Sequence, residues 1–163
     1  MPPLIRNRAV STDDWVYADA ENAAGAAKLV LPLADYLAAA GEGRAGPDCG
    51  VLLMPADHDL EALRPYVARL PLIAVHFGSS GEGRGYTQGR LLRERFGYAG
   101  ELRACGAVRA DQIWFLARCG FDAFDIATGE DPATVIAQLD RFSVAYQTGL
   151  PETLTHPRAR YGR

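Results

Sequence analysis

The stretch at residues 81–126, GEGRGYTQGRLLRERFGYAGELRACGAVRADQIWFLARCGFDAFDI, decides the fold of this chain. It opens with a loop of alternating glycines. A helix, a strand, a second helix and a second strand then follow with little sequence between them. Thr87 has the position of an N-cap for the first helix, and Gly97 stands where helices commonly end. Strands and helices that alternate in this way indicate a parallel sheet with helical connections.

The alternation extends beyond this stretch on both sides. Apolar runs such as LIAVHF at residues 72–77 are typical of strands that are buried on both faces. Asp131 and Pro132 are typical of the start of a helix. The four expected strand–helix units place strands at residues 51–55, 72–77, 101–105 and 121–126, and helices at 57–70, 87–96, 108–119 and from 131 onward. We therefore expect a single α/β domain at residues 1–150 with a mainly parallel sheet, either open or curved like half a barrel.

The N-terminal part is expected to add short strands at residues 11–20 and 28–33 and a helix at 34–40. These strands, or a second copy of the chain in a homodimer, would complete the edge of a half-barrel-like sheet. Residues 151–163 are polar and broken by prolines, which predicts a flexible C-terminal tail.

The composition is that of an ordinary globular domain of 163 residues, with 48% hydrophobic residues and a formal net charge of −3. An acidic chain is not expected to bind nucleic acid, because phosphate binding needs a basic surface. No apolar run has membrane-spanning length and the N-terminus lacks the apolar centre of a signal peptide. We therefore expect no membrane association and a cytoplasmic protein. Cys49, Cys105 and Cys119 are odd in number and far apart, which predicts neither a disulfide framework nor a metal site.

The loop before the first helix has the composition of a small-anion site. Its glycines leave backbone N–H groups open, Arg84 adds positive charge, and the N-terminus of the helix adds the helix dipole. A tight turn with a solvated arginine would have the same spacing. Neither the dinucleotide fingerprint nor the nucleotide-binding phosphate loop is present, so we do not expect a nucleotide. The expected anion-binding residues are Gly83, Arg84, Gly85, Tyr86, Thr87, Arg90 and Arg103.

Three residues carry groups that could take part in catalysis: Glu82, His76 and Cys105. Glu82 lies in the loop. His76 ends the strand before it and could act as an acid, a base or an anion ligand, or be purely structural. Cys105 ends the next strand, where nearby Arg103 would lower the pKa of its thiol, unless the side chain packs as a small hydrophobic group. No cofactor motif or redox-active cysteine pair is present, so the cofactor is unknown, and a flavin bound without a motif stays open.

Three runs of the chain resemble a bacterial family called domain of unknown function 934. They are GRGYTQGRLLRERFGYAGELRACG at residues 83–106, DQIWFLARCGFDAF at 111–124 and FSVAYQ at 142–147. Members of this family are often labelled as oxidoreductases of sulfite reduction, because their genes lie beside that of haem sulfite reductase. The family's loop usually begins with aspartate where this chain has Glu82. It also has glycine-aspartate-valine where this chain reads Gly106, Ala107 and Val108, so the carboxylate of that aspartate is missing here.

The resemblance and the loop together imply two functions. The first is a non-catalytic accessory of assimilatory sulfite reduction, which binds sulfite reductase or a small sulfur oxyanion at the loop. The absence of a redox motif favours it. The second is an enzyme, such as an oxidoreductase, that acts on a small anionic substrate at the same loop. Arg84 and the loop amides would then hold the charge, and Glu82 or His76 would move a proton.

Overall fold

The computed structural model describes residues 3–18, 26–79, 81–145 and 147–150, and the expected tail at 151–163 lies outside them. The eight strands of the described residues form one sheet in the order β2-β1-β8-β7-β6-β5-β4-β3. From β3 to β8 the neighbouring strands are parallel, whereas β1 is antiparallel to both β8 and β2. The N-terminal strands therefore extend the sheet at both of its ends. The strands are β1 (Leu4–Arg6), β2 (Ala9–Ser11), β3 (Val16–Tyr17), β4 (Leu29–Pro32), β5 (Cys49–Leu53), β6 (Leu72–Phe77), β7 (Glu101–Gly106) and β8 (Ala123–Asp125).

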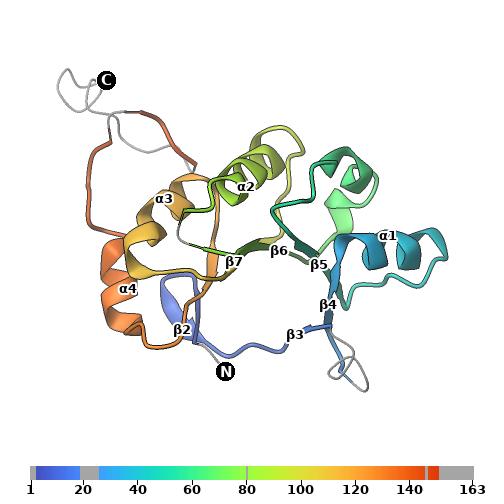
Figure 1. Ribbon diagram of the computed structural model, residues 1–163, viewed down its shortest axis with the longest axis horizontal. Helices are drawn as coiled ribbons and strands as arrows, with labels where there is room; N and C mark the ends of the chain where they lie inside the picture. Colours follow the sequence, from blue (N-terminus) through green and yellow to red (C-terminus); the bar gives the residue numbers. More distant parts are fainter. Residues whose placement is uncertain (1–2, 19–25, 80, 146, 151–163) are drawn as a thin grey trace.

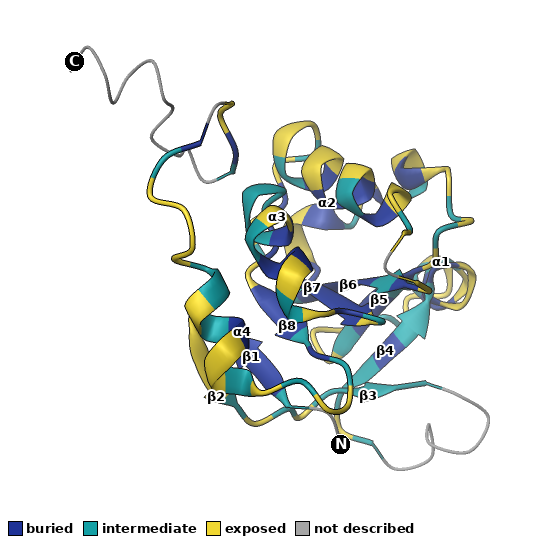
Figure 2. Ribbon diagram, turned by 60° about the vertical axis from the view of Figure 1, so that its left-hand side comes forward, coloured by how far each residue is buried: buried dark blue, intermediate teal, exposed yellow. Residues whose placement is uncertain are grey.

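The helices cover one face of this sheet, which curls like half a barrel (Figures 1 and 2). Helix α1 packs against β4 and β5, α2 packs against β6, and α3 contacts α4. The described α-helices are α1 (Leu33–Gly41), α2 (Arg84–Glu94), α3 (Ile113–Arg118) and α4 (Pro132–Gln138). The 3-10 helices are η1 (Leu60–Leu63), η2 (Val67–Arg69) and η3 (Ala110–Gln112).

No described helix covers the other, concave face of the sheet. Instead, residues 12–15, which we call the crossing segment, run across it from β2 to β3 (Figure 1). Alternation along the strands separates two groups of buried side chains. In β6, Ile73 and Val75 belong to the main core under the helices, whereas Leu72 and Ala74 belong to a smaller cluster on the concave face. The concave face is thus lined by every second residue of each strand.

The sequence predicted the sheet better than its connections. A single α/β sheet that is mostly parallel and curved like half a barrel is confirmed, but four consecutive strand–helix units are not. The helix expected at 57–70 is wrong, because this stretch forms only the short η1 and η2. Pro65 explains the interruption, since proline has no N–H to donate and its ring clashes with the preceding helical turn.

The start of α2 also differs from the expectation. The helix begins at Arg84, three residues before the expected cap, with Gly83 as N-cap and no side-chain hydrogen bond capping it. Thr87 therefore lies inside the first turn and is not the N-cap. The last helix agrees with its signature, because the Asp131 side chain caps α4 by accepting a hydrogen bond from the N–H of Thr134 at 3.0 Å.

Two glycines allow α2 to lie close to the aromatic side chains beneath it. A Cβ atom on Gly85 would come within 2.5 Å of the Phe77 ring, and one on Gly89 within 2.4 Å of the Phe121 ring. Any larger residue would force the helix and the sheet apart. Gly85, which the sequence assigned to an anion site, is therefore required for packing.

A buried arginine holds the crossing segment against the concave face. Arg103 of β7 is 0% exposed and donates two hydrogen bonds to the carboxylate of Asp13, at 2.6 and 3.1 Å. Its Nη2 atom also lies 2.7 Å from Oε1 of Glu101, whose other oxygen accepts a hydrogen bond from Arg6 of β1 at 3.1 Å. Each of these charges has an oppositely charged partner, as buried charges require. The network fixes the path of the chain just before Tyr17.

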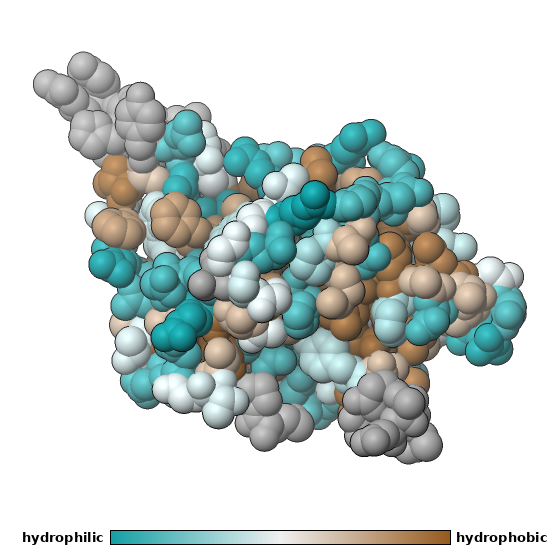
Figure 3. All heavy atoms as spheres, in the orientation of Figure 1, coloured by the Kyte–Doolittle hydropathy of each residue, from teal (hydrophilic) through white to brown (hydrophobic). Residues whose placement is uncertain are grey.

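Figure 3 shows hydrophilic residues among the hydrophobic ones on the face seen there. None of the helices that the structure describes is long and apolar enough to cross a membrane.

Candidate functional site

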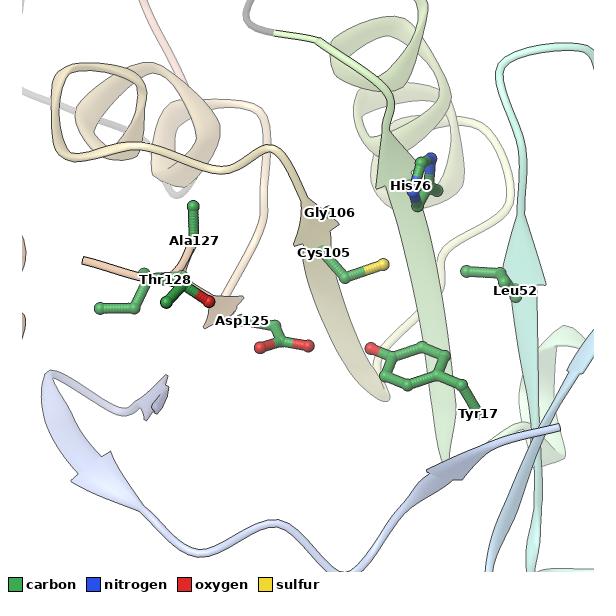
Figure 4. A pocket seen from close by; sticks show the side chains of 9 residues that line it. Tyr17, Leu52, His76, Cys105, Gly106, Asp125, Ala127 and Thr128 are labelled. Carbon is green, nitrogen blue, oxygen red and sulfur yellow. The ribbon is translucent and has the colours of Figure 1, made fainter. Parts of the chain in front are cut away.

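A cavity of about 430 Å³ opens on the concave face, where the parallel strands end. Its walls are mostly apolar, and a few polar groups converge on it, as is typical of small-molecule sites. Figure 4 shows the side chains of Tyr17 and Asp125 pointing toward each other across it. The lining residues are Tyr17, Leu52, His76, Cys105, Gly106, Asp125, Ile126, Ala127 and Thr128.

Strand register brings three of these residues together. His76 of β6 pairs with Cys105 of β7, so both side chains lie on the same face of the sheet. Asp125 lies two residues after Ala123, which pairs with Arg103 of β7, and it therefore stands beside Cys105 in the next strand. The carboxyl ends of β6, β7 and β8 thus supply a histidine, a thiol and a carboxylate. Ligands commonly bind at this edge of parallel sheets.

Gly106 keeps the space beside His76 open. Its φ of +90° favours glycine, and a Cβ atom there would come within 2.5 Å of the Phe77 carbonyl oxygen and 2.9 Å of Nε2 of His76. A larger residue could be placed only by moving the imidazole or the strand. The sharp turn after β7 and the room for His76 therefore depend on the same residue.

Asp125 has the most perturbed carboxyl group of the cavity. Burial raises its pKa from the usual 3.8 to about 6, and the positive charge of Arg103 only partly offsets this effect. No hydrogen bond or ion pair to its side chain occurs within the described part of the chain. An acid with a pKa near 6 can both accept and release a proton close to neutral pH.

Cys105 does not have the lowered thiol pKa that its neighbour Arg103 suggested. Burial raises the pKa of this thiol to about 12, and Arg103 opposes the effect only weakly because its own charge is paired with Asp13 and Glu101. The thiol also lies 3.5 Å from the carbonyl oxygen of Val75. Cys105 is therefore a protonated, weakly polar part of the cavity wall and not a thiolate nucleophile.

Two more polar groups face this space. Nδ1 of His76 is buried and has no hydrogen-bond partner within the described residues, which is costly unless a water or ligand satisfies it. The hydroxyl of Tyr17 lies beside the Cys105 thiol and the Arg103 guanidinium, and burial raises its pKa. The phenol is therefore neutral and can donate a hydrogen bond.

The glycine-arginine loop lies at the N-terminus of α2, away from these residues. The Glu82 carboxylate accepts a hydrogen bond from the backbone N–H of Arg84 at 3.3 Å, so it occupies one of the amides that an anion would use. Tyr86 packs edge-on against the Phe77 ring, with 5.3 Å between the ring centres. Together with Gly85, this aromatic contact serves to dock the helix on the sheet.

The structure does not gather the arginines that the sequence grouped at the loop. Arg90 is exposed and pairs with Glu94 at 2.9 Å, as expected for residues four apart on a helix. Arg103 lies on the concave face, fully buried and paired with two carboxylates. Of these three arginines, Arg84 alone has no carboxylate partner for its guanidinium within the described residues.

Arg84 instead contacts a histidine. Its Nη1 atom lies 2.9 Å from Nδ1 and 3.0 Å from Nε2 of His58, and both side chains line a smaller cavity of about 270 Å³. Thr87 lines the same cavity, as does Gln88, whose amide donates hydrogen bonds to the carbonyl oxygens of Met54 and Asp57. Two basic side chains thus face each other beside the start of α2.

Sequence reasoning missed two polar residues of the larger cavity, Asp125 and Tyr17. Asp125 had a usable signal. In FDAFDI, strict alternation places Phe124 in the core under the helices and Asp125 on the opposite face, at a strand end. Tyr17 had none, because its position depends on the crossing segment and on an ion pair between residues 90 positions apart.

No group of three or more histidine, cysteine, aspartate or glutamate side chains in the described ranges is arranged to hold a metal ion. The cavity contains no disulfide-forming pair either, because Cys105 is a free thiol.

The fold and the cavity define an α/β protein with a half-barrel sheet and a ligand-sized site at its strand ends. The chain belongs to the family described as "Bacterial protein of unknown function (DUF934)", whose model matches residues 50–156. No curated protein shows significant similarity to the chain. The matched region supplies His76, Cys105 and Asp125, whereas Tyr17 and the crossing segment lie before it.

Proposed function

We propose that the protein binds a small molecule in the concave-face cavity and exchanges a proton with it, with Asp125 as the acid or base. The observation that carries this proposal is the unpaired, half-buried Asp125 carboxyl group in a mostly apolar cavity at the strand ends. Catalytic acids and bases are commonly tuned by burial in this way.

The neighbouring groups suit this role. His76 and Tyr17 offer hydrogen bonds on the other side of the cavity, and Leu52 and Ile126 give apolar surface for the body of a ligand. A volume of about 430 Å³ falls within the range of small-molecule pockets. The ligand would thus be oriented by its polar end toward Asp125.

A neutral probe substrate tests the proton transfer without knowledge of the natural ligand. The ring of 5-nitrobenzisoxazole opens when a base removes its ring C–H proton. The proton passes to the base, the N–O bond breaks and a coloured nitrophenolate forms. We expect the wild type to open the ring about a hundredfold faster than Asp125→Asn. The rate should rise with pH through about 6, where Asp125 ionises.

Two tryptophan substitutions test whether the reaction takes place in the concave-face cavity. Ala127 lines the cavity, so Ala127→Trp should fill it and abolish the rate difference. Ala133 is exposed on α4, and Ala133→Trp should leave the rate unchanged. Equal rates for the wild type and a correctly folded Asp125→Asn would refute the role of Asp125.

A second candidate is an anion-binding accessory role in sulfite reduction, at the cavity beside Arg84. The observation that favours it is the pair of basic side chains, Arg84 and His58, without a carboxylate on the Arg84 guanidinium within the described residues. The helix dipole of α2 would add to the attraction. The link to sulfite reductase itself stays a prediction from the family resemblance.

Calorimetric titration with sulfite and with sulfate tests this second role. Arg84→Gln should abolish any binding, whereas Arg90→Gln should not, because Arg90 is already paired with Glu94. If neither anion binds the wild type, a pull-down with purified sulfite reductase would remain as the test of a protein partner. Failure of both measurements would remove the accessory role.

A further inference from the structure

Among the described residues, the charged groups around Asp125 on the concave face are not balanced. Arg103 and Arg6 carry two positive charges, and Asp13 and Glu101 carry two negative charges in contact with them. Asp125 is the additional carboxylate on this face. When ionised, it leaves one negative charge without a partner among the described residues.

An ionised Asp125 carboxylate destabilises the folded protein at this half-buried position. A carboxylate removed from water and left unpaired is destabilising, and an opposite charge brought next to it recovers part of the lost free energy. Among the described residues, the elements next to Asp125 offer no unpaired guanidinium or ammonium group. Asp13 of the crossing segment adds a second negative charge nearby, and His76 lies two strands away on β6. Tyr17 of β3 and Cys105 of β7 stay neutral because burial raises their pKa values, and Arg103 is already paired.

On this basis we propose that the cavity selects a small cation, namely a primary amine or ammonium group carried on an apolar body. The inference rests on the proposed function, and it names the class of ligand that Asp125 would hold. The ammonium group lies against the Asp125 carboxylate and donates a second hydrogen bond to the Tyr17 hydroxyl, which points toward Asp125 (Figure 4). The apolar body lies along Leu52, Ile126 and Ala127.

The size of the cavity agrees with such a ligand. A cavity of roughly 150 Å³ is enough for benzene, so about 430 Å³ leaves room for one aromatic ring with a side arm and for ordered water. An anionic ligand would instead meet the Asp125 carboxylate, whereas the basic residue of the cavity lining, His76 on β6, lies two strands away from it. The concave site and the Arg84 cavity thus favour ligands of opposite charge.

Three probes of nearly equal shape test the charge preference: benzylamine, benzyl alcohol and benzoate. Binding to the full chain is measured at pH 7.5 by protein-observed NMR titration. We expect benzylamine to bind roughly tenfold more tightly than benzyl alcohol, and benzoate to bind most weakly. At pH 5, below the pKa of about 6, protonation of Asp125 should reduce the preference for the amine.

Two variants test whether the preference for benzylamine comes from Asp125. Asp125→Asn should bind benzylamine no more tightly than benzyl alcohol, so the preference for the amine is lost. Asp140→Asn removes an exposed carboxylate that pairs with Arg8 on the surface, and it should keep the preference.

The outcomes separate the two proposals. Equal binding of all three probes, or tighter binding of benzoate, would overturn the cation preference but leave a ligand site in the cavity. If no probe binds or shifts the signals of the lining residues, both the cation preference and the proposed function fail.

Discussion

The concave cavity and the start of α2 both hold polar residues beside a hollow, but they differ in what each residue does for the fold. At the start of α2, Gly85 and Tyr86 dock the helix, and Glu82 occupies the amide of Arg84. In the concave cavity, Asp125 stabilises nothing within the described chain. A group that the fold does not use, held where burial makes it costly, is the better candidate for function.

The largest difference in stability is expected between variants of Arg103 and Arg90, two arginines that the sequence analysis both assigned to the anion site. Arg103→Met would leave the mostly buried Asp13 carboxylate without its charged partner and Glu101 with Arg6 alone, and we expect a loss of about 3–5 kcal/mol in the free energy of unfolding. Arg90→Met breaks only an exposed pair and should cost less than about 0.5 kcal/mol. Urea unfolding of both variants measures the difference. Similar losses would show that the buried network does not hold the crossing segment.

The next largest difference in stability is expected between variants of two glycines near the start of α2, Gly85 and Gly83. Gly85→Ala would place a Cβ atom 2.5 Å from the Phe77 ring, whereas a Cβ atom on Gly83 would meet nothing within 4 Å. We expect a loss of roughly 1–3 kcal/mol for Gly85→Ala from overpacking, and little change for Gly83→Ala. Thermal unfolding reports both. A stable Gly85→Ala variant would free this glycine for a role in anion binding.

Replacing Asp125 should have a smaller effect on the stability, and this effect should depend on pH. Because its folded-state pKa of about 6 lies above the usual 3.8, the folded chain binds more protons between these values, and its stability falls as the pH rises through this window. Asp125→Asn should therefore stabilise the protein by about 1 kcal/mol at neutral pH, after allowance for solvent screening. The gain should vanish near the usual pKa of 3.8.

Denaturation of both proteins at several pH values measures this gain. A constant difference between the wild type and Asp125→Asn across the window would contradict the raised pKa.

The smallest change in stability is expected when Arg84 is replaced. Its side chain is exposed and contacts only His58 among the described residues, so Arg84→Gln should change the stability by less than about 0.5 kcal/mol. Urea unfolding measures it. A clear loss of stability would mean that Arg84 helps to hold the segment before η1 against α2, which would weaken its case as a ligand-binding residue.

These contrasts also show which parts of the molecule were readable from the sequence. Local signals predicted the central strands β5 to β8 and the capped start of α4, because apolar runs and an Asp-Pro cap act within a few residues. The break at Pro65 had a local signal as well, because a proline interrupts a helix. The two positions of the site that the sequence did name, His76 and Cys105, follow from the rule that strand ends bind ligands.

The remaining features depend on contacts between distant parts of the chain. Arg103 and Arg90 look alike in the sequence, and only the approach of Asp13 separates the buried charge from the surface charge. The raised pKa of the Cys105 thiol similarly follows from burial and from the pairing of Arg103, not from the presence of an arginine two residues away.

The crossing segment has a consequence for how such a site could diverge. The family match begins at residue 50 and includes the floor of the cavity, whereas Tyr17 reaches the cavity from a part of the chain outside the match. The shape of the cavity therefore depends partly on residues outside the matched region. A chimera that exchanges residues 9–17 for those of another member, while keeping Asp13, would change the shape of the site without touching Asp125 or the central sheet.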